Sequence, residues 1–321
     1  MVFVEYLIGT EPTSGFLWLL LDNELLVVVN SKIGLWLLAA RPKTLVASII
    51  PVSLGVCLAF RQVNNLSIAL IAMCLIFSIL VQIATNFAND YFDSLTGADD
   101  SRELAPKRFS DSELIKGIYL RNASYIILVL AFVIGVFIME FSGASRFLLL
   151  IGICSVICAL AYTGGPFPFA YNGLGDFFVV IFFGFVAVCT THYVLVSSRA
   201  EIWNPNWIVP LGVGFIINNL LVVNNYRDRE TDKKVGKKTM VVILGRKFGI
   251  FLYFLGYLIS CVICPWVDNQ LLILLSFFPL SLCLVYKLNK AKEKKDFDFI
   301  LTTTAVSVLL YGVTAGWAIL D

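Results

Sequence analysis

The sequence predicts an all-α membrane protein with nine transmembrane helices. Of its 321 residues, 59% are hydrophobic and only 14% are charged, and the mean hydropathy is +0.87. Soluble globular domains have far more charged residues and a lower mean hydropathy. Apolar runs of about 16 to 23 residues recur along the chain, close to the ~20 residues that cross a bilayer as a helix. These observations exclude an ordinary soluble enzyme.

The first 32 residues are predicted to form an N-terminal extension ahead of a single transmembrane domain of residues 33–321. The extension contains short apolar pieces but also several acidic residues. No basic region precedes a cleavage site, so we expect neither a signal peptide nor a span here. Residues 31–40 are expected to form an amphipathic helix that leads into the first span, with Trp36 at headgroup depth.

The predicted spans follow one another through the rest of the chain. The third and fourth apolar runs are short, so we expect their helices to begin in the polar residues before them. The nine runs cover residues 44–60, 66–87, 124–139, 147–162, 174–196, 207–223, 248–267, 271–288 and 299–320.

The distribution of Lys and Arg supports this arrangement. Basic residues are retained in the cytoplasmic loops of membrane proteins. With a cytoplasmic N-terminus and nine spans, all basic residues except Arg61, Arg146 and Arg199 fall on the cytoplasmic side. Because one shifted span would destroy this asymmetry, it favours both the count and the orientation.

One pattern of Asn and Asp occurs twice, each time where an apolar run meets a basic loop. The spacing of i, i+4 and i+7 or i+8 places three residues of each copy on one helix face. Charge at a membrane edge can be a simple solvated cap, but two matching copies favour a binding site, because buried charge there is costly. The first copy is Asn86, Asn89, Asp90 and Asp93, and the second is Asn224, Asn225, Asp228 and Asp232.

The loops after the two copies indicate the chemistry. Carboxylate oxygens at helical spacing suit Mg²⁺, which completes its octahedron with water and phosphate oxygens. Nearby Lys and Arg would neutralise the remaining phosphate charge. Two such half-sites could hold one diphosphate and stabilise the charge that develops as it leaves. The candidate phosphate-binding residues in these loops are Lys107, Arg108, Lys237 and Lys238.

The two copies resemble the aspartate motifs of the UbiA superfamily of intramembrane prenyltransferases. Further segments resemble the branch that prenylates 1,4-dihydroxy-2-naphthoate in menaquinone synthesis. The resemblance begins near residue 34 and does not include residues 1–32. The segments that carry it are residues 40–45 (ARPKTL), 89–93 (NDYFD) with Gly97 and Asp99, 162–166 (YTGGP), 173–176 (GLGD), 224–232 and 236–239 (GKKT).

The resemblance implies nine transmembrane helices around a central cavity. It also implies Mg²⁺-dependent ionisation of an allylic polyprenyl diphosphate, attack by an electron-rich aromatic carbon, and loss of a carboxylate in the naphthoate branch. The expected location is the bacterial cytoplasmic (inner) membrane, with the active site facing the cytoplasm. No nucleic-acid partner is expected.

The resemblance also assigns roles to residues. Asp90, Asp93, Asp228 and Asp232 would be the catalytic metal-binding carboxylates. Asp99 would be a further ligand, although many superfamily members carry an Asp where this chain has Gly97. The four Asn side chains would bind substrate directly or through water. Other expected substrate-binding residues are Arg41, Lys43 and Tyr162, and the aromatics predicted to shield a carbocation are Tyr91, Phe92, Tyr162 and Tyr226.

The remaining reactive side chains are expected to be structural. All eight cysteines fall inside predicted spans, where packing explains them. Cys261 and Cys264 form a C-x-x-C pair, but no second pair or His lies nearby in sequence, so we exclude a zinc site. His192, the one histidine, is expected to be a hydrogen-bonded packing residue near the outer leaflet.

Two alternatives stay open. The acceptor could be another aromatic compound, such as a regioisomeric dihydroxynaphthoate, 4-hydroxybenzoate or a tetrapyrrole. The protein could instead be a cation or metabolite transporter whose acidic residues bind the translocated ion. Transporters, however, usually place such residues near the midplane on broken helices, whereas both copies here are predicted at the same cytoplasmic rim.

Overall fold

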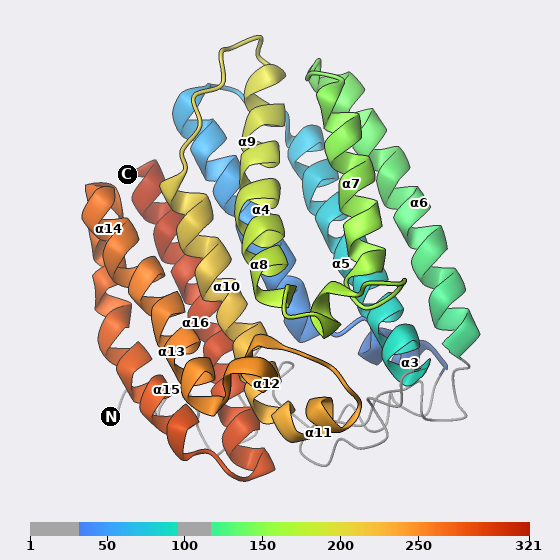
Figure 1. The fold of residues 1–321 in the computed structure, drawn as a ribbon. Coiled ribbons are helices and arrows are strands. Elements are labelled where there is room, and N and C mark those ends of the chain that lie inside the picture. Colours follow the sequence, from blue (N-terminus) through green and yellow to red (C-terminus); the bar gives the residue numbers. More distant parts are fainter. Residues whose placement is uncertain (1–31, 96–116) are drawn as a thin grey trace.

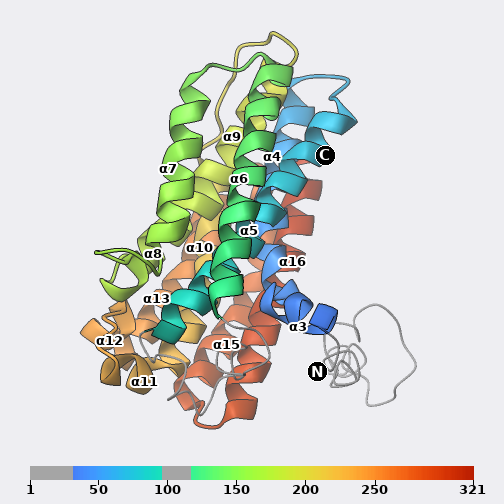
Figure 2. The same ribbon diagram turned by 90° about the vertical axis from the view of Figure 1, so that its right-hand side faces the viewer.

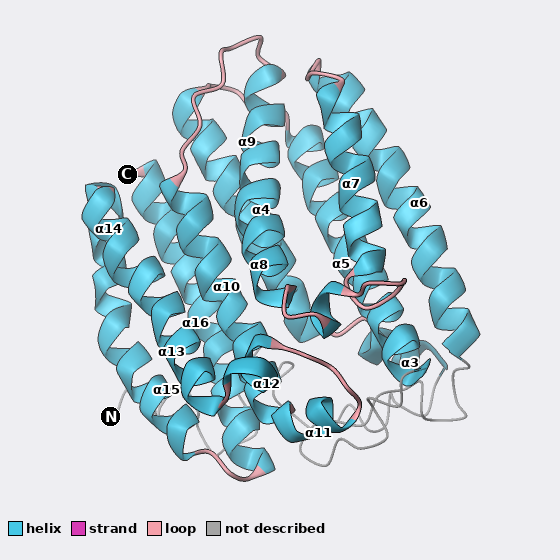
Figure 3. Ribbon diagram, in the orientation of Figure 1, coloured by secondary structure: helices cyan, strands magenta, loops and turns pink. Residues whose placement is uncertain are grey.

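The computed structural model describes residues 32–95 and 117–321, and all regular structure in these ranges is helical (Figures 1 and 3). The predicted N-terminal extension, apart from its last residue, lies outside the described residues. The helices are α3 (Lys32–Ala39), α4 (Pro42–Gln62), α5 (Ile68–Leu95), α6 (Gly117–Ser142), α7 (Phe147–Ala161), η3 (Phe169–Tyr171), α8 (Gly175–Val179), η4 (Val180–Val186), α9 (Ala187–Ser197), α10 (Ile208–Arg227), α11 (Arg229–Lys234), α12 (Met240–Leu244), α13 (Arg246–Leu258), η5 (Ile259–Ile263), α14 (Cys264–Val267), η6 (Asn269–Phe277), α15 (Phe278–Lys290) and α16 (Lys294–Leu320).

The predicted all-α membrane fold is confirmed. Within the described ranges, eight helices are long and apolar enough to cross a membrane. Three of them are built from consecutive elements: Gly175–Ser197, Arg246–Val267 and Asn269–Lys290. The fourth predicted run forms α7, which has only 15 residues, so the count of nine membrane-crossing helices stays a prediction.

The expected extension of the two short runs is correct for one of them. Helix α6 begins at Gly117, seven residues before the apolar run at Ser124. Helix α7 begins with the apolar run, at Phe147, so the expected polar first turn was wrong there. Gly143 has a φ of +63°, and the Ser145 hydroxyl accepts the amide of Phe147 at 3.3 Å. This tight turn uses the polar residues that could have lengthened α7.

The long helices run alternately up and down, and α10 packs at the centre of the C-terminal half (Figures 1 and 2). Its closest neighbour is η4. A Cβ atom on Gly184 would lie 2.5 Å from the carbonyl oxygen of Pro210, and one on Gly214 would lie 2.8 Å from that of Val180. The backbones of η4 and α10 are therefore in direct contact.

The basic residues of the described ranges are divided between the two ends of the bundle as predicted. Arg61, Arg146 and Arg199 lie at the ends of α4, α7 and α9 that form the upper end in Figure 1. The lower end carries α3, α11, α12 and the α15–α16 turn. Both copies of the Asn/Asp pattern also belong to this lower, basic end, because α5 and α10 both finish there.

Candidate active site

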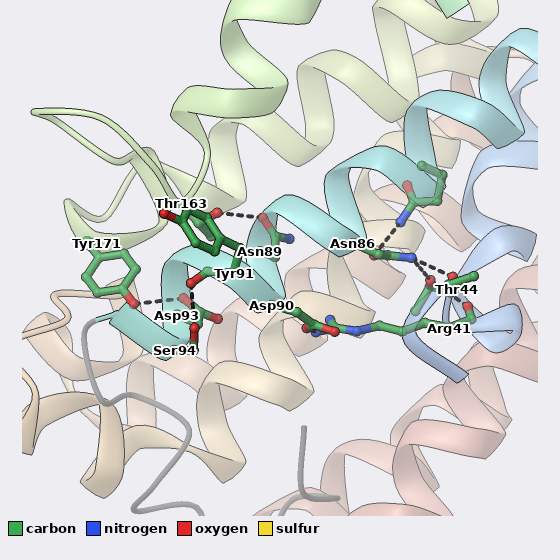
Figure 4. A network of polar contacts seen from close by, with 12 residues as sticks. Arg41, Thr44, Asn86, Asn89, Asp90, Tyr91, Asp93, Ser94, Thr163 and Tyr171 are labelled. Carbon is green, nitrogen blue, oxygen red and sulfur yellow. Dashed lines mark hydrogen bonds and ion pairs between the residues drawn. The ribbon is translucent and has the colours of Figure 1, made fainter. Parts of the chain in front are cut away.

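The first acidic copy lies on the last three turns of α5, where the helix continues unbroken to Leu95 (Figure 4). Asn86, Asp90 and Asp93 are all buried, with exposed fractions of 3%, 2% and 1%. The prediction that these residues share one helix face is confirmed by the continuous helix. Such buried carboxylates require partners, since an unpaired buried charge is strongly destabilising.

Arg41 supplies the partner of Asp90. One of its terminal guanidinium nitrogens contacts Asp90 Oδ1 (Figure 4). Arg41 lies at the break between α3 and α4 and has a left-handed φ of +53°. Pro42 follows it, and the proline ring disfavours the helical conformation of the residue that precedes it. The chain therefore breaks at the position that directs Arg41 towards α5.

Asn86 holds this break in place. Its Nδ2 donates to the carbonyl oxygen of Ala40 at 2.8 Å and to Thr44 Oγ1 at 3.1 Å. Gln82 Nε2 in turn donates to Asn86 Oδ1 at 3.2 Å. Both the nitrogen and the oxygen of the Asn86 amide are therefore hydrogen-bonded within the protein, and the bonds from its nitrogen hold the segment that carries Arg41.

The segment after α7 contacts the same end of α5. Thr163 Oγ1 donates to Asn89 Oδ1 at 2.7 Å, and the Tyr171 hydroxyl donates to Asp93 Oδ1 at 2.7 Å (Figure 4). Gly164 permits this approach, because a Cβ there would lie only 2.4 Å from the Phe92 ring. The Gly-Gly-Pro turn is thus part of the first half-site.

The spacing predicted that the second acidic copy would lie on one continuous helix, and this prediction was wrong. Helix α10 ends at Arg227, and α11 begins at Arg229, with Asp228 as the residue between them. The amide of Asp228 still donates to the carbonyl of Asn224 at 2.9 Å, and that of Asp232 to the carbonyl of Asp228 at 2.8 Å. The side chains therefore keep near-helical spacing although the helix axis bends.

Each carboxylate of the second copy also has a basic neighbour. The Arg227 guanidinium donates to both oxygens of Asp228, at 2.7 and 2.9 Å, and both residues are buried. Lys237 Nζ lies 3.7 Å from Asp232 Oδ1. Buried ion pairs of this kind are retained at a cost in desolvation, so they favour a site over a mere surface cap.

Tyr171 connects the two copies. While its hydroxyl donates to Asp93, its ring lies 5.2 Å from Lys237 Nζ, and its carbonyl accepts the amide of Lys238 at 3.0 Å. Lys237 then contacts Asp232. A continuous set of contacts therefore joins Asp93 on α5 to Asp232 on α11.

The predicted site residues divide into three groups. The four aspartates, the four asparagines, Arg41, Lys237 and Tyr162 lie at or beside this site. Asn224 differs from its partners, because its Nδ2 donates back to the carbonyl of Leu220 on its own helix at 3.0 Å. Lys238 is exposed, and it meets the site only through its backbone. Asp99, Lys107, Arg108 and the side chain of Lys43 lie outside the described residues.

Sequence reasoning missed two residues that complete the site. Arg227 carried a detectable signal, since it is a charged residue directly before Asp228 at the end of an apolar run. Tyr171 carried none, because it is one of several aromatic residues in a short loop. Its role depends on how η3 packs between α5 and the segment after α11.

An apolar cavity of about 240 Å³ lies beside the part of α5 that directly precedes the first acidic copy. Gln82, which contacts Asn86, lines it together with Thr85 and Tyr162, and the rest of the wall comes from α4 to α9. The predicted aromatic lining was largely wrong. Tyr162 lines the cavity, but Tyr91 and Phe92 pack on each other, and Tyr226 packs on Phe297. The other aromatic wall residues are Phe77, Phe132, Phe178, Phe182 and Phe183.

Tyr162 stands between the carboxylates and this cavity, one residue beyond the end of α7. Its hydroxyl can both donate and accept a hydrogen bond.

The donor set fits Mg²⁺. The four aspartates offer hard carboxylate oxygens from two chain segments, which is the chemistry this ion prefers. In residues 32–95 and 117–321, however, no three His, Cys, Asp or Glu side chains form a group that could hold a metal by themselves. A site of paired carboxylates suits an ion that keeps water or phosphate oxygens as further ligands.

Comparison with known proteins decides the family. Residues 48–317 match the model of the UbiA prenyltransferase family. The chain belongs to this family. The protein is thus an integral membrane prenyltransferase, in agreement with its apolar helices.

Relatives within the UbiA family extend over most of the chain. The 1,4-dihydroxy-2-naphthoate octaprenyltransferase of Escherichia coli is 35% identical over 224 residues, covering 67% of this chain and 70% of that protein. The enzyme of the same name from Haemophilus influenzae is 32% identical and covers 68% and 71%. The human UbiA prenyltransferase domain-containing protein 1 is 28% identical over 88% of this chain and 82% of its own length.

Solved structures share the fold at low sequence identity. A UbiA homolog from Archaeoglobus fulgidus bound to DMAPP and Mg²⁺ has a TM-score of 0.59 at 16% identity, covering 89% of this chain and 98% of that one. A homolog from Aeropyrum pernix has a TM-score of 0.60 at 12% identity, covering 85% and 98%. This likeness confirms the UbiA-type fold.

Proposed function

We propose that the protein transfers a polyprenyl chain from an allylic polyprenyl diphosphate to 1,4-dihydroxy-2-naphthoate, with loss of the carboxylate, in menaquinone biosynthesis. The observation that carries the proposal is that Tyr171 links the two acidic copies beside an apolar cavity, whose wall includes Gln82 and Thr85 just before the first copy. The acceptor is inferred from the relatives, whose names specify this naphthoate. The proposed location is the bacterial cytoplasmic membrane, with the site facing the cytoplasm.

The aspartates would hold Mg²⁺, which would neutralise the diphosphate and assist its departure. Arg41, Arg227 and Lys237 each lie against one of these carboxylates. When a diphosphate enters, these cations would be shared between the carboxylates and the phosphate oxygens. The residues therefore supply preorganised positive charge where negative charge develops in the transition state.

The cavity would receive the hydrocarbon chain. Its wall is predominantly apolar and aromatic, and it includes Gln82 and Thr85, which directly precede the first acidic copy on α5. An allylic cation survives only where water is excluded, and aromatic faces stabilise positive charge. The rings of Phe178 and Phe182 are stacked with their centroids 6.1 Å apart. Among the aromatic wall residues, these two come next after Asp176 in the sequence.

The metal requirement can be tested by charge removal. Asp90→Asn or Asp228→Asn should preserve insertion and lower Mg²⁺-dependent turnover by about 100-fold or more, if each carboxylate contributes a few kcal/mol in the transition state. Turnover would be measured with geranyl diphosphate and 1,4-dihydroxy-2-naphthoate, with and without EDTA. Glu201→Gln, an exposed acidic position at the other end of the bundle, is the matched control. Wild-type turnover in either aspartate variant would refute the metal assignment.

A panel of acceptors separates the proposal from its alternatives. Membranes containing the protein would be incubated with a polyprenyl diphosphate, Mg²⁺ and the naphthoate, its regioisomers, 4-hydroxybenzoate or a tetrapyrrole. Selective prenylation of another acceptor would replace the naphthoate assignment. Ion flux in proteoliposomes without any prenylated product would favour the transporter.

A further inference from the structure

A third polar group lies apart from the two acidic copies. Asp176 is in the first turn of α8, and Asn218 on α10 donates its Nδ2 to Asp176 Oδ1 at 3.1 Å. Tyr162 completes the group. A Cβ on Gly175 would lie 3.3 Å from the Tyr162 hydroxyl oxygen, so this hydroxyl is directly beside the start of α8.

This group differs chemically from the acidic copies. In the described part of the chain, the partner of Asp176 from another helix is a neutral amide, whereas Asp90, Asp228 and Asp232 face basic side chains. Asn218 is only 2% exposed, and its Oδ1 has no hydrogen-bond partner among the described residues. A buried acceptor without a donor is costly. The group therefore suits a neutral ligand that donates hydrogen bonds.

The position of the group matches that of a second substrate. Asn218 precedes Asn225 by two helical turns on the same face of α10, which places it ~10 Å further from the basic end. Tyr162 also lines the apolar cavity. With the diphosphate at the acidic copies and the chain in the cavity, the reactive carbon would lie between them. The aromatic ring of the acceptor must reach the position of this reactive carbon.

We propose that Asp176, Asn218 and Tyr162 form the recognition site for the ring hydroxyl groups of the aromatic acceptor. This inference rests on the proposed function and adds the residues that select the acceptor. Asp176 and Asn218 Oδ1 accept hydrogen bonds from the ring hydroxyls, and the Tyr162 hydroxyl bonds to a ring oxygen. A site built around substrate hydroxyls rejects analogues that lack them.

The experiment compares Asp176→Asn and Asn218→Ala with a neighbouring control. Asn219→Ala is the matched control: Asn219 is buried on α10, and its side-chain oxygen and nitrogen also have no hydrogen-bond partner among the described residues, but it packs against Gly256 on α13, away from Asp176. Purified full-length protein would be assayed for the KM of the acceptor, the KM of geranyl diphosphate, and thermal stability. Binding of 1,4-dihydroxy-2-naphthoate and of its dimethyl ether would be measured by calorimetry in the presence of an unreactive geranyl thiodiphosphate.

For both test variants we expect the acceptor KM to rise by about 10-fold or more, the effect of losing one hydrogen bond to a charged or buried group. The KM of the diphosphate should change by less than ~2-fold, and Asn219→Ala should leave the acceptor KM unchanged. The wild-type protein should bind the free hydroxyl form about 10-fold more tightly than the dimethyl ether, and Asp176→Asn should lose this preference.

The outcomes distinguish this inference from the proposed function. Transfer to the naphthoate with an acceptor KM that neither variant changes would overturn the recognition site alone. Binding of the naphthoate that depends on Asp176, without any transfer, would overturn the proposed function and support the recognition site. A purely structural Asp176, which stabilises the start of α8 through the helix dipole, would lower thermal stability without changing acceptor selectivity. A wild-type protein that neither binds nor prenylates the naphthoate would overturn both.

Discussion

The buried carboxylates determine the character of the site at the scale of single residues. Each of the four aspartates is at most 7% exposed, and each contacts a base or a hydroxyl from another position in the chain. Removing one partner of such a pair leaves a buried charge uncompensated, which costs several kcal/mol. Arg41, Arg227, Lys237 and Tyr171 are therefore as necessary to the arrangement as the aspartates themselves.

Tyr171→Phe tests the connection between the half-sites. The variant keeps the ring that Lys237 contacts and removes only the hydroxyl that donates to Asp93. We expect kcat/KM for prenyl transfer to fall by about 10-fold, since a hydrogen bond to a charged group contributes ~1.5–3 kcal/mol. Tyr119→Phe, at an exposed position on α6, should have no effect. Equal activity in the Tyr171 and Tyr119 variants would show that the connection is dispensable.

At the scale of elements, irregular segments place the site residues. The α3–α4 break directs Arg41 to α5, the turn after α7 brings Thr163 and Tyr171 to the same helix, and the bend at Asp228 separates α10 from α11. Each break depends on a local cause, such as Pro42 after Arg41. The long helices between the breaks supply the rigid support that holds these segments in register.

The backbone contact between η4 and α10 is a second element-level feature that can be tested. Gly184→Ala would place a methyl group 2.5 Å from the Pro210 carbonyl oxygen, so the helices must separate. Overpacking of this kind costs about 1–3 kcal/mol. We expect a lower melting temperature in detergent together with reduced transfer activity, because α10 carries the second acidic copy.

Gly152→Ala is the matched control for Gly184→Ala. Its added methyl group would lie 3.6 Å from the Phe132 ring, an ordinary contact. Alanine also has the higher helix propensity, so stability should be unchanged or slightly greater. If both variants melt at the wild-type temperature, close packing of η4 on α10 does not limit stability.

The whole molecule is polarised between its two ends. The ends of α5 and α10, which carry the acidic copies, and the short helices α11 and α12 all lie at one end (Figure 1). The apolar cavity is lined by α5 residues that precede the first copy, up to Thr85. The positive charges at that end favour a cytoplasmic orientation. This arrangement suits a charged diphosphate that arrives from water and a hydrocarbon chain that stays in the membrane.

Cysteine labelling checks the orientation. Asn64→Cys and Lys292→Cys place exposed thiols at the upper and lower ends of the bundle, respectively. In intact cells, a membrane-impermeant maleimide should label only the Asn64 variant, and permeabilised cells should show labelling of both. The unmodified protein corrects for its own cysteines. Labelling of the Lys292 variant alone in intact cells would invert the proposed topology.

Local sequence patterns were enough to predict the membrane class, the approximate bounds of most spans and the four aspartates proposed for the site. These properties follow from local patterns: apolar runs, charge asymmetry and helical spacing within one segment. Three-dimensional packing was needed to show that Arg41 pairs with Asp90, that Tyr171 contacts Asp93, which aromatics line the cavity, and that Asp176 meets Asn218. These contacts join residues that are more than 40 positions apart in the chain, and hydrophobic periodicity carries no information about which helices become neighbours.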